Sequence, residues 1–147
     1  MSIELKYDKK IHLDKWDIDV TPYITIENME SIINDLINCN YGLERDMRLM
    51  ADVLVACTNL YDDKEAHYTY EEVLYSGLWD DMLNACPYLK QCIERIEKEV
   101  DDLLSVKRSL ISFIDSLTEK VQKFELSDLD TDKLVEAVNA LSSKIGE

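Results

Sequence analysis

A long run of apolar residues at heptad spacing is the sequence feature that most constrains the fold. From Leu89 to Phe124 the apolar positions follow one another at alternating intervals of four and three residues, and only Lys107 interrupts them. This spacing aligns the positions along one side of an α-helix. The sequence therefore predicts one long amphipathic helix over residues 87–124, with Pro87 in the first turn, where proline is well tolerated.

The predicted helix is too long for a compact domain of this size. Its 38 residues would extend for roughly 57 Å at about 1.5 Å per residue, whereas a compact chain of 147 residues is roughly 30 Å across. Part of the helix must therefore project, fold back at a break, or pack on another subunit.

The apolar stripe widens in the middle of this helix, where apolar residues also occur outside the heptad positions. This predicts that residues 103–114 are buried on several sides, in the core of a bundle with projecting ends. Lys107 takes an a position, where a polar residue can set the register or the number of helices. Alternatively, its ammonium group reaches solvent or a carboxylate on another helix. The candidate oligomer seam comprises Leu103, Lys107, Leu110 and Ile114.

Helical periodicity recurs in other parts of the chain. It predicts helices over about 25–39, 43–60 and 131–143, and a capped helix that starts at Thr69 and breaks at Gly77. The last helix should return antiparallel along the end of the long one, because the connection is short. Residues 1–22 alternate between apolar and polar side chains, which predicts a β-hairpin or meander. We therefore expect a mainly α fold in a single domain, residues 1–147, with a helical bundle over residues 23–147.

The charge limits the classes of partner. There are 31 acidic and 16 basic residues, a formal charge of −15. Such a field repels phosphate backbones and anionic lipid surfaces, so we expect neither direct nucleic-acid binding nor membrane binding. It is compatible with a basic protein partner; the alternative is that the charge only keeps a soluble domain soluble. Four cysteines without a C-x-x-C pair indicate free thiols in a reducing compartment, and hence a cytoplasmic protein.

No motif in the sequence calls for an enzymatic reaction. The two histidines, His12 and His67, match no metal-binding spacing, and the paired carboxylates should face water. We therefore expect a non-enzymatic protein with no catalytic, cofactor or metal site. The sequence leaves open whether Cys57 or Cys86 lies near His67.

Tyrosine and tryptophan cluster with acidic residues in the middle of the chain. Such aromatic side chains often carry the binding energy of protein interfaces. The alternative is a partly buried loop in which tyrosine fills space. The candidate partner-binding residues are Asp62, Asp63, Tyr68, Tyr70, Glu71, Glu72, Tyr75 and Trp79.

The chain is short and acidic, is rich in Ile, Asp, Asn, Lys and Tyr, and has a strand region before a helical bundle with one long helix. In this overall character it resembles small proteins of tailed phages that infect low-GC bacteria. The resemblance implies a virion component, an assembly factor or an inhibitor of host defence, located in the host cytoplasm or in the virion.

These observations favour two functions over a third, a small enzyme or ligand-binding bundle with a polar pocket at His67 and a cysteine. The first is a protein-interaction or assembly protein that works as an oligomer through its long helix and its N-terminal strands. The second is an inhibitor whose carboxylates imitate a nucleic-acid backbone and occupy a basic cleft, with Asp62, Asp63, Glu71 and Glu72 as the central charges.

Overall fold

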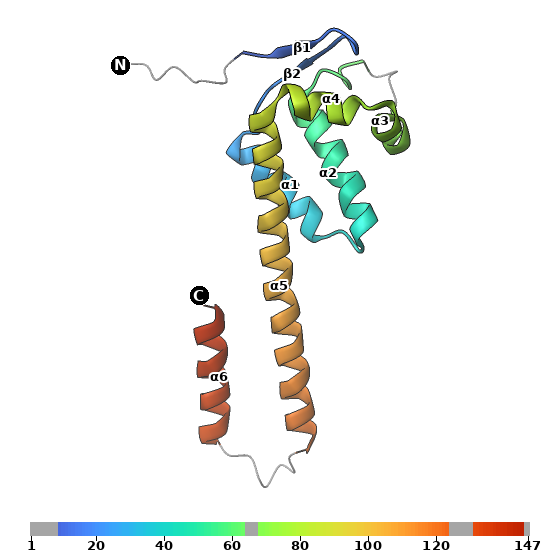
Figure 1. The fold of residues 1–147 in the computed structure, drawn as a ribbon. Helices are drawn as coiled ribbons and strands as arrows, with labels where there is room; N and C mark the ends of the chain where they lie inside the picture. The colour runs from blue at the N-terminus through green and yellow to red at the C-terminus, as the bar shows by residue number, and fades with distance from the viewer. Residues whose placement is uncertain (1–8, 64–67, 124–130, 146–147) are drawn as a thin grey trace, which may run out of the picture. The chain divides into compact units, whose positions relative to one another are not determined.

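A computed structural model describes residues 9–63, 68–123 and 131–145 (Figure 1). It confirms a mainly α chain with one long helix and a small antiparallel hairpin. The elements are β1 (Ile11–Leu13), β2 (Ile18–Val20), α1 (Ile26–Ile37), α2 (Gly42–Cys57), α3 (Tyr70–Ser76), α4 (Leu78–Ala85), α5 (Pro87–Lys123) and α6 (Thr131–Ile145). The chain divides into two compact units, residues 1–105 and 106–147. That the whole chain forms one domain stays a prediction.

The hairpin packs on the helices through its second strand. In register, Ile11 pairs with Val20 and Leu13 with Ile18, and both Ile18 and Val20 are buried. The amide of Thr21 donates to the carbonyl of Cys57 at 2.7 Å. The expected alternation is thus confirmed for these strands, whereas the predicted strand through Ile3, Leu5 and Tyr7 lies outside the described residues.

Local sequence signals set the ends of several helices. The hydroxyl of Thr25 accepts from the amide of Asn28 at the start of α1, and Thr69 with Glu72 forms the predicted capping box of α3. Gly77 has a φ of 83°, a left-handed conformation that costs glycine little, and it separates α3 from α4. Helix α2 ends at Cys57, short of the predicted Leu60, because Thr58 adopts an extended backbone.

The apolar core of residues 1–105 lies between β2, the helices α1 to α4 and the first part of α5. From α5 it takes Leu89, Cys92, Ile93, Ile96 and Val100. Helical periodicity places Ile26 and Met47 on the inner faces of their helices, but both are exposed. Ile26 is 76% exposed because it is the first residue of α1, and Met47 lies at the rim of a shallow cavity.

All four thiols are free, as expected. Cys57, Cys86 and Cys92 are buried in this core, and Cys39 is half-buried.

The second unit contains residues 106–123 of α5 together with α6. Helix α6 runs back beside this half of α5 (Figure 1), and the ammonium group of Lys144 lies 6.0 Å from the centre of the Phe113 ring. No side chain among residues 106–123 and 132–145 is buried. Here α6 is the one described helix beside α5, so each helix is covered along a single flank.

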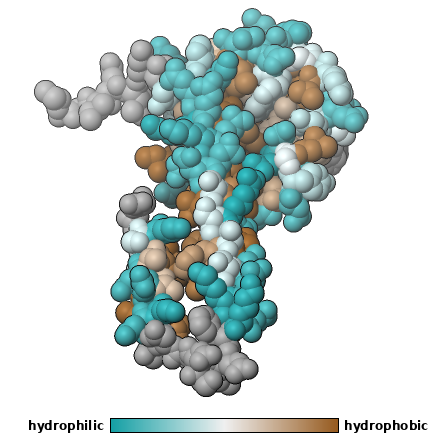
Figure 2. All heavy atoms as spheres, turned by 60° about the horizontal axis from the view of Figure 1, so that its bottom comes forward, coloured by the Kyte–Doolittle hydropathy of each residue, from teal (hydrophilic) through white to brown (hydrophobic). Residues whose placement is uncertain are grey.

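The expected burial of residues 103–114 on several sides is therefore wrong within one chain. Leu103, Val106, Ile111 and Ile114 are all exposed, and Leu104, Leu110 and Phe113 are half-buried. The widened apolar stripe is present in the sequence, but the described residues of the second unit leave it exposed. Figure 2 shows apolar side chains of this unit at the molecular surface.

Candidate interaction surfaces

Two of the predicted aromatic binding residues belong to the core of residues 1–105. Tyr70 and Trp79 are half-buried and pack against its buried side chains. Their rings therefore contribute to folding, which leaves less of them available to a partner.

Glu72 is also engaged inside the chain. Its carboxylate accepts from the backbone amide of Thr69 at 2.8 Å and from the Thr69 hydroxyl at 3.1 Å. The backbone hydrogen bond, followed by that of the hydroxyl, lowers the pKa of Glu72 below its ordinary 4.5. This carboxylate caps α3 and is not a free charge.

The exposed members of the cluster are Asp62, Asp63, Tyr68, Glu71, Glu72 and Tyr75. Tyr75 is 82% exposed. Tyr68 meets the edge of the Tyr61 ring, with the ring centres 6.5 Å apart. The structure thus separates the predicted cluster into two half-buried aromatic residues, Tyr70 and Trp79, and an exposed remainder.

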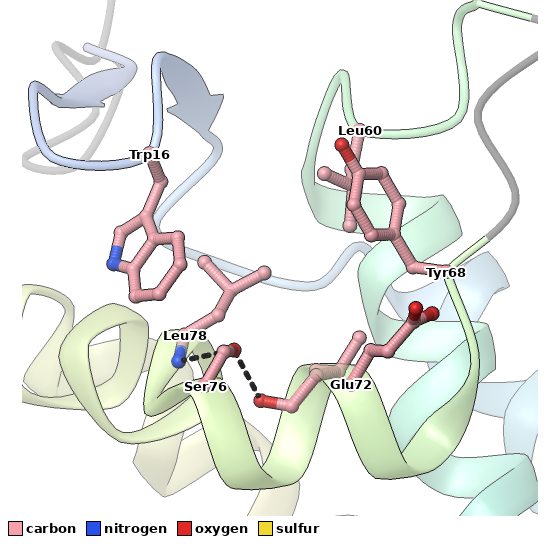
Figure 3. Close-up of a pocket in the computed structure, with 7 residues that line it drawn as sticks. Trp16, Leu60, Tyr68, Glu72, Ser76 and Leu78 are labelled. Atoms are coloured by element: carbon pink, nitrogen blue, oxygen red, sulfur yellow. Dashed lines mark hydrogen bonds between the residues drawn. The ribbon is translucent and has the colours of Figure 1, made fainter.

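Two small cavities lie on either side of Tyr68 and Val73, which line both. Each has a volume of about 180 Å³. The first is lined by Trp16, Leu60, Tyr68, Glu72, Val73, Ser76 and Leu78 (Figure 3). The second is lined by Met47, Met50, Ala51, Leu54, Tyr61, Tyr68, Thr69, Tyr70 and Val73.

These cavities fit an apolar side chain better than a cofactor. Small-molecule sites usually enclose roughly 300–1,000 Å³ and contain a few converging polar groups. In the first cavity the Ser76 hydroxyl already donates to the carbonyl of Val73 at 3.1 Å and accepts from the amide of Leu78 at 3.3 Å (Figure 3). Its polar groups therefore serve the helix junction rather than a ligand.

Asp81 holds the hairpin to α4 in a way that the sequence pattern does not show. Its carboxylate accepts from Lys15 Nζ at 2.8 Å and from the Trp16 indole at 3.0 Å. The Lys15 hydrogen bond, followed by that of Trp16, lowers the pKa of Asp81. The alternation marks Trp16 as apolar, but no local signal pairs it with a residue so distant in the sequence.

His12 lies among three carboxylates of the hairpin. Its Nδ1 is 2.9 Å from Asp19, and its Nε2 is 3.7 Å from both Asp14 and Asp17. The hydrogen bond with Asp19 is the main cause that raises the pKa of His12 above 6.5. Over the part of the chain that is described, no three His, Cys, Asp or Glu side chains are grouped so as to hold a metal ion.

The buried thiol of Cys57 is a poor nucleophile. Burial raises its pKa to about 12, so the reactive thiolate is scarce at neutral pH. Its sulfur donates to the carbonyl of Tyr23 at 3.6 Å. His67, the histidine considered as its base, lies outside the described residues.

The second unit carries an uncovered apolar surface on two facing helices. On α5 the half-buried residues Leu110, Phe113 and Leu117 face α6, and on α6 the half-buried residues Ala137 and Leu141 face α5. An α-helix turns by about 100° per residue. Viewed along its axis, each helix therefore has its exposed apolar residues roughly 80° away from its half-buried ones, in the direction of increasing residue number.

The two helices run in opposite directions. An equal rotation about each helix axis therefore brings both exposed flanks to the same side of the helical hairpin that α5 and α6 form. They form one surface, which we call the apolar face. It comprises Ile111, Ile114 and Val121 of α5 and Leu134, Val135, Val138 and Ile145 of α6, all of them exposed.

The predicted seam residues divide between these surfaces. Ile114 belongs to the apolar face, Lys107 lies on the same flank of α5, and Leu110 faces α6. Leu103 is exposed at the end of the first unit. Lys107 is exposed and forms no ion pair with a residue that the structure describes, so the expected long-range partner is not found there.

No family model, no curated protein and no solved structure matches the chain. Across residues 9–63, 68–123 and 131–145, no helix combines the length and the apolar character needed to cross a bilayer.

Proposed function

We propose that this is a non-enzymatic protein-interaction or assembly protein whose binding surface is the apolar face. The observation that carries the proposal is the absence of any buried side chain among residues 106–123 and 132–145. Isolated helices of about 15 residues are marginal in water, and most helical stability in proteins comes from packing an amphipathic face. A binding partner would supply the missing layer.

The apolar face also exposes more apolar surface to water than is favourable for solubility. Single apolar residues at a surface are normal, but contiguous exposed patches typically mark interaction sites. Ile114 and Val138, for example, are 55% and 57% exposed. Their placement on one side of two helices supports helix-on-helix docking, a common mode of protein recognition.

The resemblance to small acidic phage proteins is consistent with this role. Virion components and assembly factors act through protein contacts, so we infer a place in that class. The resemblance supplies no binding residue, so the exposed side chains alone define the surface.

The acidic cluster gives less support to nucleic-acid mimicry. Mimicry needs free carboxylates at a spacing that follows phosphates, whereas Glu72 is used as a helix cap. Asp62, Asp63 and Glu71 are exposed. We therefore rank this function second.

Site-specific photo-crosslinking in the cells that express the full chain tests the first function and needs no partner identified beforehand. A photoreactive amino acid at Ile114 samples the apolar face, and one at Ser109 samples the opposite side of α5, which is exposed as well. We expect discrete protein adducts from position 114 and none of comparable yield from position 109.

Equal adducts from both positions, or none from position 114, would overturn the proposal. Mass spectrometry of the adduct identifies the partner as this chain or another protein. Either identity supports the proposed function, because each shows specific protein docking on the apolar face.

A further inference from the structure

The apolar face needs an occupant, and the charge of the second unit favours one kind. Residues 106–147 carry six basic and eight acidic residues, a formal charge of −2, whereas residues 1–105 carry −13. Two copies of a nearly neutral hairpin can approach closely with little electrostatic repulsion. A strongly basic partner would instead be attracted to the acidic first unit.

The flank of α5 that belongs to this face carries a symmetric pattern of charge. Lys107, Ile111 and Asp115 occur at intervals of four residues, and neighbours at this spacing form a ridge on a helix surface. Lys107 and Asp115 are exposed. They are about 12 Å apart along the helix, too far to pair with each other.

We propose that the apolar face binds a second copy of this chain, antiparallel, with the two-fold axis at Ile111. This inference rests on the proposed function and names its partner. A two-fold interface is self-complementary: where one residue meets another, the reverse contact also forms. Lys107 of each copy then lies opposite Asp115 of the other, so that two ion pairs flank the paired isoleucines.

The same pairing covers part of α6. With the axis at Ile111, residue 106 of one copy lies opposite residue 116 of the other, so the two second units overlap over residues 106–116 of α5. Lys144 lies beside Phe113 in each chain, so the C-terminal end of α6, including Ile145, lies at the level of this overlap. There each α5 helix gains a second neighbour along the flank that a single chain leaves exposed.

Charge reversal in the full chain tests this register. We expect the wild type to sediment as a dimer at micromolar concentration. K107E alone and D115K alone each create like-charge contacts at both symmetric positions, and should raise the dimer Kd by roughly tenfold or more at low salt. The double variant K107E/D115K should restore the wild-type Kd.

An equimolar mixture of the two single variants provides a second, independent readout. The K107E copy carries a carboxylate at both positions of the ridge, and the D115K copy carries an ammonium group at both. Opposite charges then meet at each symmetric contact, so the mixture should form heterodimers more tightly than either variant dimerises alone. Both substituted positions are exposed, so the helical content by circular dichroism should stay unchanged.

Two results would overturn the inference. One is a wild-type chain that stays monomeric up to about 100 μM, well above the Kd of a stable dimer. The other is a dimer whose Kd does not respond to either reversal or is not restored by combining them. If crosslinking at Ile114 still captures a different protein, the proposed function stands while the second copy is excluded as its partner.

Discussion

At the scale of single residues, Thr69 and Glu72 show how a short sequence signal becomes a structural contact. The hydroxyl of Thr69 accepts from the amide of Glu72 at 3.2 Å, while the Glu72 carboxylate accepts from Thr69. Each partner satisfies a donor that the first turn of α3 would otherwise leave without an intrahelical acceptor. Because both residues lie within four positions, the sequence alone predicts this contact.

We expect Thr69→Ala to lower the free energy of unfolding by about 1 kcal/mol, the usual cost of losing an N-cap. Urea denaturation followed by circular dichroism measures it. The contribution of the Glu72 carboxylate is present above its ordinary pKa of 4.5 and is lost as the pH falls below it, because its pKa in the folded chain is lowered.

Ser143→Ala is the matched control, since that exposed hydroxyl donates to the Ala140 carbonyl within α6 and caps no helix start. Its effect should stay within about 0.5 kcal/mol. Equal losses in both variants would show that the cap of α3 contributes nothing particular.

His12 gives the hairpin a dependence on pH. Its pKa is raised above 6.5 in the folded chain, chiefly by the hydrogen bond with Asp19 and further by the nearby carboxylates. The stabilisation is therefore fully present below pH 6.5 and is lost as the pH rises through the raised pKa. Titration of the His12 ring protons by NMR should give a midpoint above 6.5 in the wild type and a lower midpoint in Asp19→Asn. An unchanged midpoint in that variant would contradict the assignment.

At the scale of the element, α5 is one helix with two environments. Its heptad spacing is the same on both sides of Lys107, yet Ile96 is fully buried and Ile114 is 55% exposed. The spacing predicts a helix and its apolar side correctly. It does not indicate whether the cover comes from the same chain or from another, which is why the predicted burial of residues 103–114 is wrong.

The same substitution at these two isoleucines should therefore have different effects. Ile96→Ala should cost about 2–5 kcal/mol of unfolding free energy, since it opens a cavity in a packed core. Ile114→Ala should cost less than about 0.5 kcal/mol when the chain is dilute enough to be monomeric. Denaturation at nanomolar concentration, followed by intrinsic fluorescence, compares the two; similar losses would mean that Ile114 is buried within one chain.

The β1–β2 hairpin shows a second limit on what can be predicted from the sequence. The alternation of Ile18, Asp19 and Val20 predicts a strand with one buried side, and the structure confirms it. The anchor formed by Asp81 with Lys15 and Trp16 joins residues more than 60 positions apart. Pairing at that separation depends on the tertiary fold, so it cannot be predicted from periodicity or from local propensity.

At the scale of the whole molecule, the two units differ in composition and in burial. Residues 1–105 enclose a core and carry −13 of the net charge of −15, whereas the second unit has no buried side chain among its described residues. The net charge alone suggests that the whole chain repels anionic partners. The charge is unevenly distributed, however, and the helical hairpin of the second unit is nearly neutral. Two copies of that hairpin can associate with little electrostatic repulsion.

Oxidative crosslinking of Ile111→Cys most directly tests the pairing of two copies through the apolar face. Cys39 is replaced by serine, because the other native thiols are buried. If Ile111 lies at the two-fold axis, the introduced thiols of two copies meet, and mild oxidation should give a species of twice the 17.1 kDa chain mass. Ser109→Cys, on the opposite side of α5, should give little. Crosslinking at position 111 that does not exceed that at position 109 would contradict the account.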